Sequence, residues 1–531
     1  MKEYVQSMPV HAPINPAESL TAIGEKIRDY AVSQPNKIAL IDNGISVTWR
    51  ELVFRINAIA NRLQDAGLKT GDTVAGLSEN SADYVALYLG VLTAGGCMVP
   101  LSGMASGESL ALMINDCDAR FLFVSEKNTA LLEEVRDQLT NVSPEWRIGL
   151  DFRPPDSSLT LDDLLADSPS APCIADVGLD DPFNIIYSSG TTGTPKGILH
   201  DHRFRWRQIQ RMGSYGLNGD AINLVSTPLY SNTTLVSALP TLFYGGTLVL
   251  MRKFNAREFL ELAQQHRVTH AMLVPVQYQR ILAEPDFDQF DLSSFKFKSS
   301  TSAPLRAEVI REAMARWPGN IIEVYGLTEG GISTSLDCAA FPDKWDSVGR
   351  PTEGAEVRII SEDGKELPAG EIGEIVGRAG AMMRGYYRRE EQTSDMLWTS
   401  PDGLTFYRSG DMGRLDDDNF LFILDRRKDM IISGGFNIYA VDLEKVLLEH
   451  PAVADAAVIG IPSDHWGETP LGLIVRKPGD NAAIKDILEW ANQRLGKSQR
   501  ISGLEWRDEL PRSTIGKVLK RELRAPYMNN A

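Results

Sequence analysis

The stretch that most constrains the fold reads Tyr187-Ser188-Ser189-Gly190-Thr191-Thr192-Gly193-Thr194-Pro195-Lys196-Gly197, directly after an apolar run that predicts the end of a strand. Its glycines let the backbone adopt positive φ and turn several N–H groups toward one point. The hydroxyls add hydrogen-bond donors, and Lys196 adds a positive charge. A bound polyphosphate needs these groups together. The order differs from the Walker A pattern, because Gly197 follows Lys196 and no helix-forming run comes next.

Around this stretch, strand-like and helix-like patterns alternate along the chain. Residues 20–65 predict a helix, a hairpin that turns at Asn43-Gly44, and a second helix. Further strands are predicted at residues 74–77, 248–251 and 271–274. Asn255 can cap the helix between the last two, with Glu258 three residues later. The alternation favours a doubly wound α/β sheet.

A different pattern begins near residue 350. Short strands separated by Gly, Asp and Pro turns indicate a β-rich unit, and they are predicted at residues 356–360, 375–377, 405–407 and 420–423. Beyond the charged run at residues 425–429, helix and strand patterns indicate a compact α+β module. We therefore expect a main domain over residues 1–427, with the β-rich subdomain at about 350–427, and a second domain over residues 428–531.

The composition argues against several classes of partner. The chain has 531 residues and a formal net charge of -17, so it repels nucleic acid and anionic membranes. The uncharged stretch at residues 84–100 contains glycines and Pro100, which favours a buried helix and strand over a membrane span. The N-terminus lacks the apolar core of a signal peptide, and the four cysteines have no metal-binding spacing. We expect reduced, buried thiols in a cytoplasmic protein.

The stretch at residues 187–197 resembles the signature loop of the AMP-forming adenylating enzymes, which include acyl- and aryl-CoA ligases, adenylation domains of peptide synthetases, and luciferases. Five further segments resemble motifs of that family, in the family's order: Tyr325-Gly326-Leu327-Thr328-Glu329, Tyr407-Arg408-Ser409-Gly410-Asp411, Arg426-Arg427-Lys428-Asp429, Ser433-Gly434-Gly435-Phe436-Asn437-Ile438 and Pro511-Arg512-Ser513-Thr514-Ile515-Gly516-Lys517. The resemblance extends from about residue 20 to 525, and it is greatest to a stand-alone acyl-CoA ligase.

The resemblance implies a fold and a motion. The expected fold is α/β: a large N-terminal domain of two doubly wound sheets and a small distorted β-barrel, followed by a small mobile α+β domain. In the family the small domain rotates about the hinge position, here Lys428. One pose presents Lys517 for adenylation. The other presents the loop at Gly434 and Gly435, where small residues allow the pantetheine arm of CoA to approach. We expect a monomer or a homodimer without a transmembrane segment.

The resemblance also implies an ATP and Mg²⁺ site with assigned roles. Lys517 would reach the α-phosphate and the substrate carboxylate, Glu329 and Thr192 would bind Mg²⁺, and Asp411 would accept hydrogen bonds from the ribose. Tyr325 would stack on adenine opposite the segment Thr301-Ser302-Ala303-Pro304. The full set of expected nucleotide and CoA residues is Ser188, Ser189, Gly190, Thr191, Thr192, Gly193, Lys196, Ser302, Ala303, Pro304, Tyr325, Gly326, Thr328, Asp411, Arg426, Lys428, Gly434 and Gly435.

The acyl pocket follows only by analogy with the family. Its expected residues are Tyr230, Ser231, Asn232, Thr233, Val324, Gly326, Gly331 and Ile332. The mixture of apolar walls with hydroxyl and amide groups is compatible with an aromatic acid or a short- to medium-chain acid that carries a polar substituent. Alternatively, the polar groups hydrogen-bond one another and carry no information on the substrate. Ser231 stands where the family often has a histidine, so no gating role is assigned to that position.

Four functions compete. The leading one is an acid–CoA ligase that forms acyl-AMP and then acyl-CoA. The second is an adenylating enzyme that passes the acyl group to the phosphopantetheine of a carrier protein or to an amine. A luciferase-like oxygenase and a non-catalytic nucleotide sensor are the others. The presence of every charged motif residue argues against the sensor: Lys196, Glu329, Asp411, Arg426 and Lys517.

Overall fold

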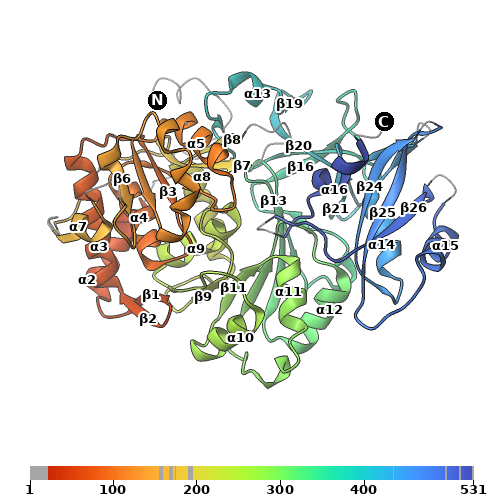
Figure 1. The fold of residues 1–531 in the computed structure, drawn as a ribbon, viewed down its shortest axis with the longest axis horizontal. Coiled ribbons are helices and arrows are strands. Elements are labelled where there is room, and N and C mark those ends of the chain that lie inside the picture. The colour runs from red at the N-terminus through yellow and green to blue at the C-terminus, as the bar shows by residue number, and fades with distance from the viewer. Residues whose placement is uncertain are drawn as a thin grey trace.

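The computed structural model describes residues 22–154, 159–166, 171–173, 175–188, 195–433, 436–463, 465–496, 499–513 and 516–528. The described residues form four β-sheets with helices packed against them (Figure 1). Two sheets are large and mostly parallel, one is a half-barrel, and the last belongs to the C-terminal part of the chain. This is the α/β class that the sequence predicts.

The first sheet has the strand order β15-β14-β13-β12-β11-β9-β10-β1-β2, with parallel pairing from β13 to β1 and antiparallel strands at both edges. Its strands are β1 (Ile38–Asp42), β2 (Ile45–Thr48), β9 (Ile222–Val225), β10 (Thr247–Leu250), β11 (His270–Leu273), β12 (Phe297–Ser300), β13 (Asn320–Gly326), β14 (Ser333–Asp337) and β15 (Arg350–Pro351). One face packs on three helices, α10 (Ala256–Gln265), α11 (Pro275–Leu282) and α12 (Ala307–Arg316). These helices lie at the bottom of the molecule in Figure 1.

The second sheet has the order β18-β8-β7-β4-β3-β5-β6. Its strands are β3 (Thr73–Leu77), β4 (Cys97–Leu101), β5 (Phe121–Val124), β6 (Arg147–Gly149), β7 (Pro182–Ser188), β8 (Lys196–Asp201) and β18 (Gly385–Tyr386). A shared apolar core joins this sheet to the first through the helices α2 (Ile23–Ser33), α3 (Trp49–Asp65), α4 (Ala82–Thr93), α8 (His202–Gly213) and α9 (Asn232–Phe243). The outer face carries α5 (Gly107–Asp116), α6 (Ala130–Glu133) and their neighbours.

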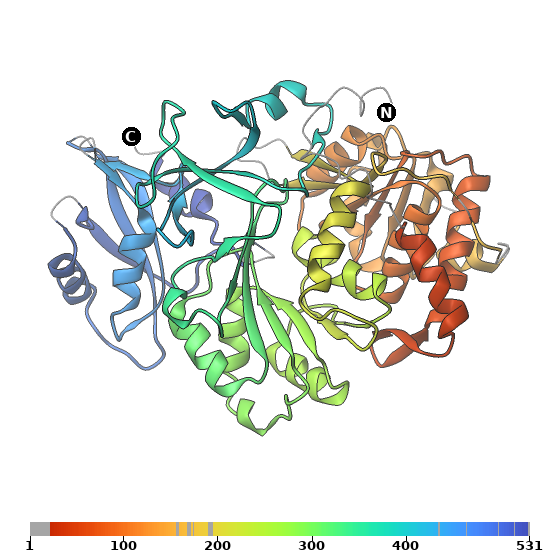
Figure 2. The same ribbon diagram turned by 180° about the vertical axis from the view of Figure 1, so that it is seen from behind.

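The half-barrel and the C-terminal sheet follow. The half-barrel consists of β16 (Glu356–Ile360), β17 (Gly373–Arg378), β19 (Leu397–Thr399), β20 (Thr405–Leu415) and β21 (Leu421–Arg426). The C-terminal sheet consists of β22 (Ile431–Ser433), β23 (Phe436–Ile438), β24 (Val453–Ser463), β25 (Gly467–Arg476) and β26 (Gly503–Arg507). Its helices are α14 (Ala440–Leu448), α15 (Ile484–Arg494) and α16 (Lys520–Met528). Figure 2 shows this part beside the half-barrel, far from α2 and α3.

Local sequence signals explain several of these elements. Asn43 and Gly44 have φ of 49° and 77°, as a two-residue hairpin turn requires. The Asn255 side chain accepts a hydrogen bond from the N–H of Glu258 and so caps α10. The uncharged stretch at residues 84–100 is the buried α4 followed by β4. Of the helices in the described part of the chain, none has the length and apolar character to cross a membrane.

Side chains from both parts of the chain meet where the C-terminal sheet faces the main body. Nη2 of Arg306 lies 3.7 Å from Oδ1 of Asp455, and Nζ of Lys445 lies 3.7 Å from Oδ1 of Asp346. The second pair is exposed, and exposed pairs at such distances contribute little to stability, about 0–1 kcal/mol each. The domain boundary at 427/428 stays a prediction, and these weak contacts are compatible with it.

Candidate active site

The phosphate-binding stretch connects two paired strand ends. Strand β7 runs antiparallel to β8, with Tyr187 opposite Gly197 and Ser188 opposite Lys196. Gly197 is required here, because a Cβ would lie 2.8 Å from a methyl carbon of Ile185. The expected phosphate ligands Ser189, Gly190, Thr191, Thr192 and Gly193 lie outside the described residues, and so does the side chain of Ser188.

Lys196 and Glu329 meet at one tyrosine. Nζ of Lys196 lies 5.2 Å from the ring centroid of Tyr386, within the range of a cation–π contact. The hydroxyl of Tyr386 donates to Oε1 of Glu329 at 3.0 Å and accepts from the hydroxyl of Tyr407 at 2.9 Å. Burial and the Glu329 charge raise the pKa of Tyr386, so it stays protonated and able to donate. The expected phosphate and Mg²⁺ residues are therefore neighbours.

Asp411 forms the centre of the expected ribose site. It is 5% exposed on β20, and the hydroxyl of Tyr325 donates to its Oδ2 at 2.7 Å. Nε of Arg426 lies 3.2 Å from its Oδ1. A carboxylate has about four lone-pair positions, so each oxygen keeps an acceptor site for a ribose hydroxyl. The hydroxyl of Ser409 accepts from the N–H of Asp411 at 2.9 Å and holds the turn.

The expected adenine segment touches the expected acyl segment. Residues 301–304 follow β12, and Ser302 has a φ of 77°, which is unusual for a residue other than glycine. The hydroxyls of Ser302 and Thr233 are 3.0 Å apart and hydrogen-bonded. Thr233 lies in the first turn of α9. This contact links the two halves of the expected site.

Lys517 reaches this site from the C-terminal part of the chain. Gly516, with a φ of 77°, lies so close to the first turn of α11 that a Cβ would be 3.0 Å from a methyl carbon of Val276. Burial, and after it the charge of Arg426, lower the pKa of Lys517 to about 8, although Asp411 and Glu329 oppose the shift. These interactions bring Lys517 together with the expected nucleotide residues. Burial also lowers the pKa of Lys428, the expected hinge.

A buried polar network, which no motif predicts, connects the nucleotide and acyl segments. Nε2 of His200 donates to the carbonyl of Thr328 at 2.7 Å, and Nδ1 accepts from Nη2 of Arg205 at 3.0 Å. Nη1 of Arg205 donates to Oδ1 of Asn232 at 2.7 Å. Burial lowers the pKa of His200 well below its usual range, so the ring is neutral, and it lowers the pKa of Arg205 to about 10, so the guanidinium stays charged at neutral pH.

The remaining pocket residues occupy two places. Ser231 precedes α9 as its N-cap position, but its hydroxyl makes no capping hydrogen bond. Val324 and Gly326 lie on β13, and Ile332 is 2% exposed in the core of the half-barrel. Gly331 has a φ of 76° and packs on Tyr407, where a Cβ would lie 2.8 Å from the Tyr407 Cβ. Because Asn232 and Thr233 bond to other protein groups, those two polar side chains are already partly satisfied.

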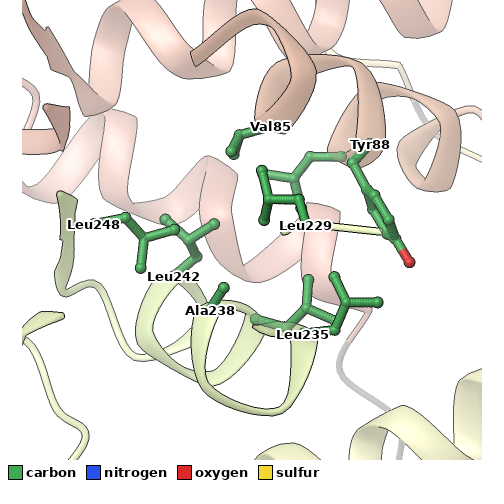
Figure 3. A pocket seen from close by; sticks show the side chains of 9 residues that line it. Val85, Tyr88, Leu229, Leu235, Ala238, Leu242 and Leu248 are labelled. Atoms are coloured by element: carbon green, nitrogen blue, oxygen red, sulfur yellow. The ribbon is translucent and has the colours of Figure 1, made fainter. Parts of the chain in front are cut away.

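A small cavity lies away from the expected site in the described part of the chain. A cavity of about 10 Å³ between α4 and α9 is lined by Val85, Tyr88, Leu89, Leu229, Leu235, Ala238, Leu239, Leu242 and Leu248 (Figure 3). It is close to the minimum that holds one water molecule, and its apolar lining excludes a polar ligand. All four cysteines are free and buried. Gly434 and Gly435, expected at the thiol tunnel, lie outside the described residues between β22 and β23.

Comparison with known proteins identifies relatives over nearly the whole chain. A family model described as AMP-binding enzyme matches residues 27–387, and one described as AMP-binding enzyme C-terminal domain matches residues 442–517. Feruloyl-CoA synthase of Amycolatopsis sp is 33% identical over 497 residues, which cover 93% of this chain and 96% of that protein. A fatty acid–[acyl-carrier-protein] ligase of Streptomyces coeruleorubidus is 30% identical over 517 residues, which cover 94% and 96%. The structure of the anthranilate CoA ligase AuaEII in complex with anthranoyl-AMP superposes with a TM-score of 0.86 at 26% identity, covering 98% of each chain.

Proposed function

Because this chain belongs to the AMP-binding enzyme family, we propose that it is an ATP-dependent carboxylic acid–CoA ligase. The resemblance inferred from the motifs is confirmed, and so is the expectation of an enzyme of the acid–thiol ligase kind. The observation that carries the proposal is the position of Lys517. It lies among Asp411, Glu329 and Arg426 although it comes from the last segment of the chain.

In the first step, a carboxylate oxygen of the acid forms a bond to the α-phosphorus of ATP, and the bond from that phosphorus to pyrophosphate breaks. A carboxylate is already a nucleophile, so the obstacle is the repulsion of two anions. Positioning and electrostatic stabilisation should therefore supply most of the rate enhancement. Lys517 holds the positive charge that this step needs. Asp411 and Tyr325 hold the ribose and adenine, and Lys196 holds the outer phosphates.

Mg²⁺ fits this arrangement. Glu329 would hold it together with Thr192 and the phosphates, and Tyr386 orients the Glu329 carboxylate. Among the described residues, no group of three or more His, Cys, Asp or Glu could bind a metal by itself. That agrees with the usual mode of Mg²⁺ at nucleotides, with one or two carboxylates plus phosphate oxygens. When bound, Mg²⁺ neutralises phosphate charge and orients the leaving pyrophosphate.

In the second step, the CoA sulfur bonds to the acyl carbon, its proton passes to solvent, and AMP leaves. This step uses the second pose of the C-terminal domain, reached by rotation about Lys428. A cytoplasmic location, where ATP and CoA are available, is part of the proposal. The rival acceptors are a carrier-protein phosphopantetheine and an amine. One relative is named for a carrier-protein acceptor, and one similar structure is that of an amide bond synthetase.

A panel of carboxylic acids with ATP and CoA tests the proposal. Pyrophosphate release and product mass are measured together, and we expect AMP, pyrophosphate and an acyl-CoA adduct for at least one acid. Release of AMP without a CoA adduct would favour a carrier-protein or amine acceptor. Formation of ADP would contradict adenylation altogether.

A further inference from the structure

Helix α8 carries an unusual amount of positive charge for a chain with a net charge of -17. Its sequence is HRFRWRQIQRMG, with arginines at positions 203, 205, 207 and 211. Arg203 pairs with Asp180 at 2.9 Å, and Nη1 of Arg207 donates to the carbonyl of Gly380. In the described part of the chain, no carboxylate lies within ion-pair distance of Arg205 or Arg211. Arg205 is fully buried and Arg211 is partly buried, and covering a cation without an anion is costly, so each needs another explanation.

Neutral acceptors account for Arg205. Its guanidinium is fully buried and donates to side-chain oxygens of Asn184, Gln208 and Asn232 and to Nδ1 of His200. Four hydrogen bonds to neutral groups satisfy most of its N–H groups. Arg205 is therefore part of the scaffold, and it has little capacity left for a ligand.

Arg211 is different. Among the described residues, one hydrogen bond of its guanidinium is seen, from Nη1 to the hydroxyl of Ser333. A guanidinium has five N–H donors, so most of its donors can serve a ligand. Burial lowers the pKa of Arg211, yet an arginine keeps its charge at neutral pH. The residue as a whole is partly exposed.

The partner of Arg211 is a sequence neighbour of expected acyl-pocket residues. Ser333 is the first residue of β14, it follows Ile332, and it pairs with Gly326 of β13. The same end of α8 borders an apolar cluster between α8, α9 and β11: Met212, Leu217, Ala221, Val236 and Met272, with Tyr215 packed against it. Tyr215 is also the electrostatic neighbour of Arg211. An apolar cluster and the guanidinium of Arg211 therefore lie at the same end of α8.

The guanidinium of Arg211 and the ammonium of Lys517 have different neighbours among the described residues. The charged neighbours of Lys517 are Arg426, Asp411, Glu329 and Lys428. None of them is a partner of Arg211, whose neighbours are Ser333 and Tyr215. The reacting carboxylate must face Lys517. If Arg211 binds the substrate, it therefore binds another part of it.

We propose that Arg211, with Ser333, binds a second carboxylate at the distal end of the acid, so that the preferred substrate is a dicarboxylic acid with an apolar middle. This rests on the proposed function for the reaction at the other end. An anion would neutralise the guanidinium through charge-assisted, bidentate hydrogen bonds. A methyl group in its place would leave the guanidinium both desolvated and unpaired. The site should therefore discriminate against the monocarboxylic analogue.

The test measures adenylation and binding separately. Aliphatic dicarboxylic acids of increasing length are each paired with the monocarboxylic acid in which a methyl group replaces the distal carboxylate. Acid-dependent exchange of pyrophosphate into ATP reports the first step alone, without CoA. Calorimetric titration of each acid, with a non-hydrolysable ATP analogue present, reports binding without turnover. The variants are Arg211→Gln and Arg211→Lys, with Arg207→Gln as the matched control one helical turn earlier.

We expect the wild-type enzyme to prefer at least one dicarboxylic acid over its partner by about 10- to 100-fold, as hydrogen bonds to a charged group predict. Arg211→Gln should abolish the preference, Arg211→Lys should restore part of it, and Arg207→Gln should keep it. The proposal would be overturned if the wild-type enzyme preferred the monocarboxylic acids. It would also be overturned if Arg211→Gln preferred the dicarboxylic acids as strongly as the wild-type enzyme does. If acids that support exchange give no CoA adduct in a separate reaction with CoA added, the CoA ligase function fails and the role of Arg211 stands. If no acid supports exchange, the calorimetric comparison decides the role of Arg211 by itself.

Discussion

The hydroxyl of Tyr325 donates a hydrogen bond to Oδ2 of Asp411 over 2.7 Å. The two residues are 86 positions apart in the chain, one on β13 of the first sheet and the other on β20 of the half-barrel. The bond therefore holds the ring that should stack on adenine at a set position relative to the carboxylate that should bind the ribose. Burial and the Asp411 charge raise the pKa of Tyr325, so it remains a donor at any working pH.

Replacing Tyr325 by Phe keeps the ring and removes this bond. We expect the KM for ATP to rise by about 3- to 10-fold with little change in kcat, because the loss affects nucleotide binding before and during the reaction alike. Steady-state kinetics at varied ATP measure this. Tyr30→Phe is a control, since the Tyr30 hydroxyl donates to the carbonyl of Phe243 elsewhere in the molecule. An unchanged KM for ATP would remove Tyr325 from the nucleotide site.

Replacing Lys517 by Ala should abolish acyl-AMP formation and spare the thioester step. Its ammonium would stabilise charge that develops at the α-phosphate, and groups of this kind contribute about 10²- to 10³-fold. Pyrophosphate exchange measures the first step, and CoA with chemically prepared acyl-AMP measures the second. Lys477→Ala, at an exposed position of the same domain, should change neither. Equal loss of both steps in Lys517→Ala would contradict the assigned role.

Adenylation should also lose activity at alkaline pH. Burial and Arg426 lower the pKa of Lys517 to about 8, so the ammonium is present below that pH and is lost above it. We expect kcat/KM for pyrophosphate exchange to fall above about pH 8, since this parameter reports ionisations of the free enzyme. Lys517→Arg keeps the charge at all these pH values, so its residual activity should lack this decline. A decline that persists in Lys517→Arg would assign it to another group.

Replacing Lys428 by Pro should spare adenylation and block the thiol step. In the described part of the chain, backbone hydrogen bonds at this turn use the N–H groups of Arg427, Asp429 and Met430 rather than that of Lys428. Proline therefore removes no backbone hydrogen bond in this pose, and it restricts the φ rotation that a hinge needs. Single-turnover assays of the two steps measure the effect, with Lys428→Ala as control. Normal overall turnover in Lys428→Pro would show that the hinge lies elsewhere.

Replacing Arg205 by Met should destabilise the protein. The change leaves the side-chain acceptors of Asn184, Gln208 and Asn232 without their donor, and each buried unsatisfied group costs about 1–3 kcal/mol. Thermal unfolding of the variant is compared with that of Arg50→Met, at an exposed position of α3. We expect a clearly lower Tm for Arg205→Met and almost no change for Arg50→Met. Equal Tm values would mean that the network contributes nothing to stability.

Patterns within short segments of the sequence predict much of this fold. The turn at Asn43-Gly44, the cap at Asn255 and the alternation of strands with helices all depend on residues close together in the chain. Such signals survive without tertiary context, because turn geometry, capping and hydrophobic periodicity are properties of short segments. The motif segments likewise identify Lys517, Glu329 and Asp411 as candidates before any distance is known.

Three-dimensional arrangement decides what the motifs leave open. Tyr386 lies in no motif, yet it lies between Lys196 and Glu329, because β18 pairs with β8 across a long stretch of chain. The burial of Arg205 and the direction of Arg211 follow from how α8 packs against α9 and β14. The sequence by itself determined the fold class, the family and the nucleotide chemistry, since these depend on local patterns. Only the tertiary structure decided which charges are buried and which have partners, because those properties depend on contacts between residues far apart in the chain.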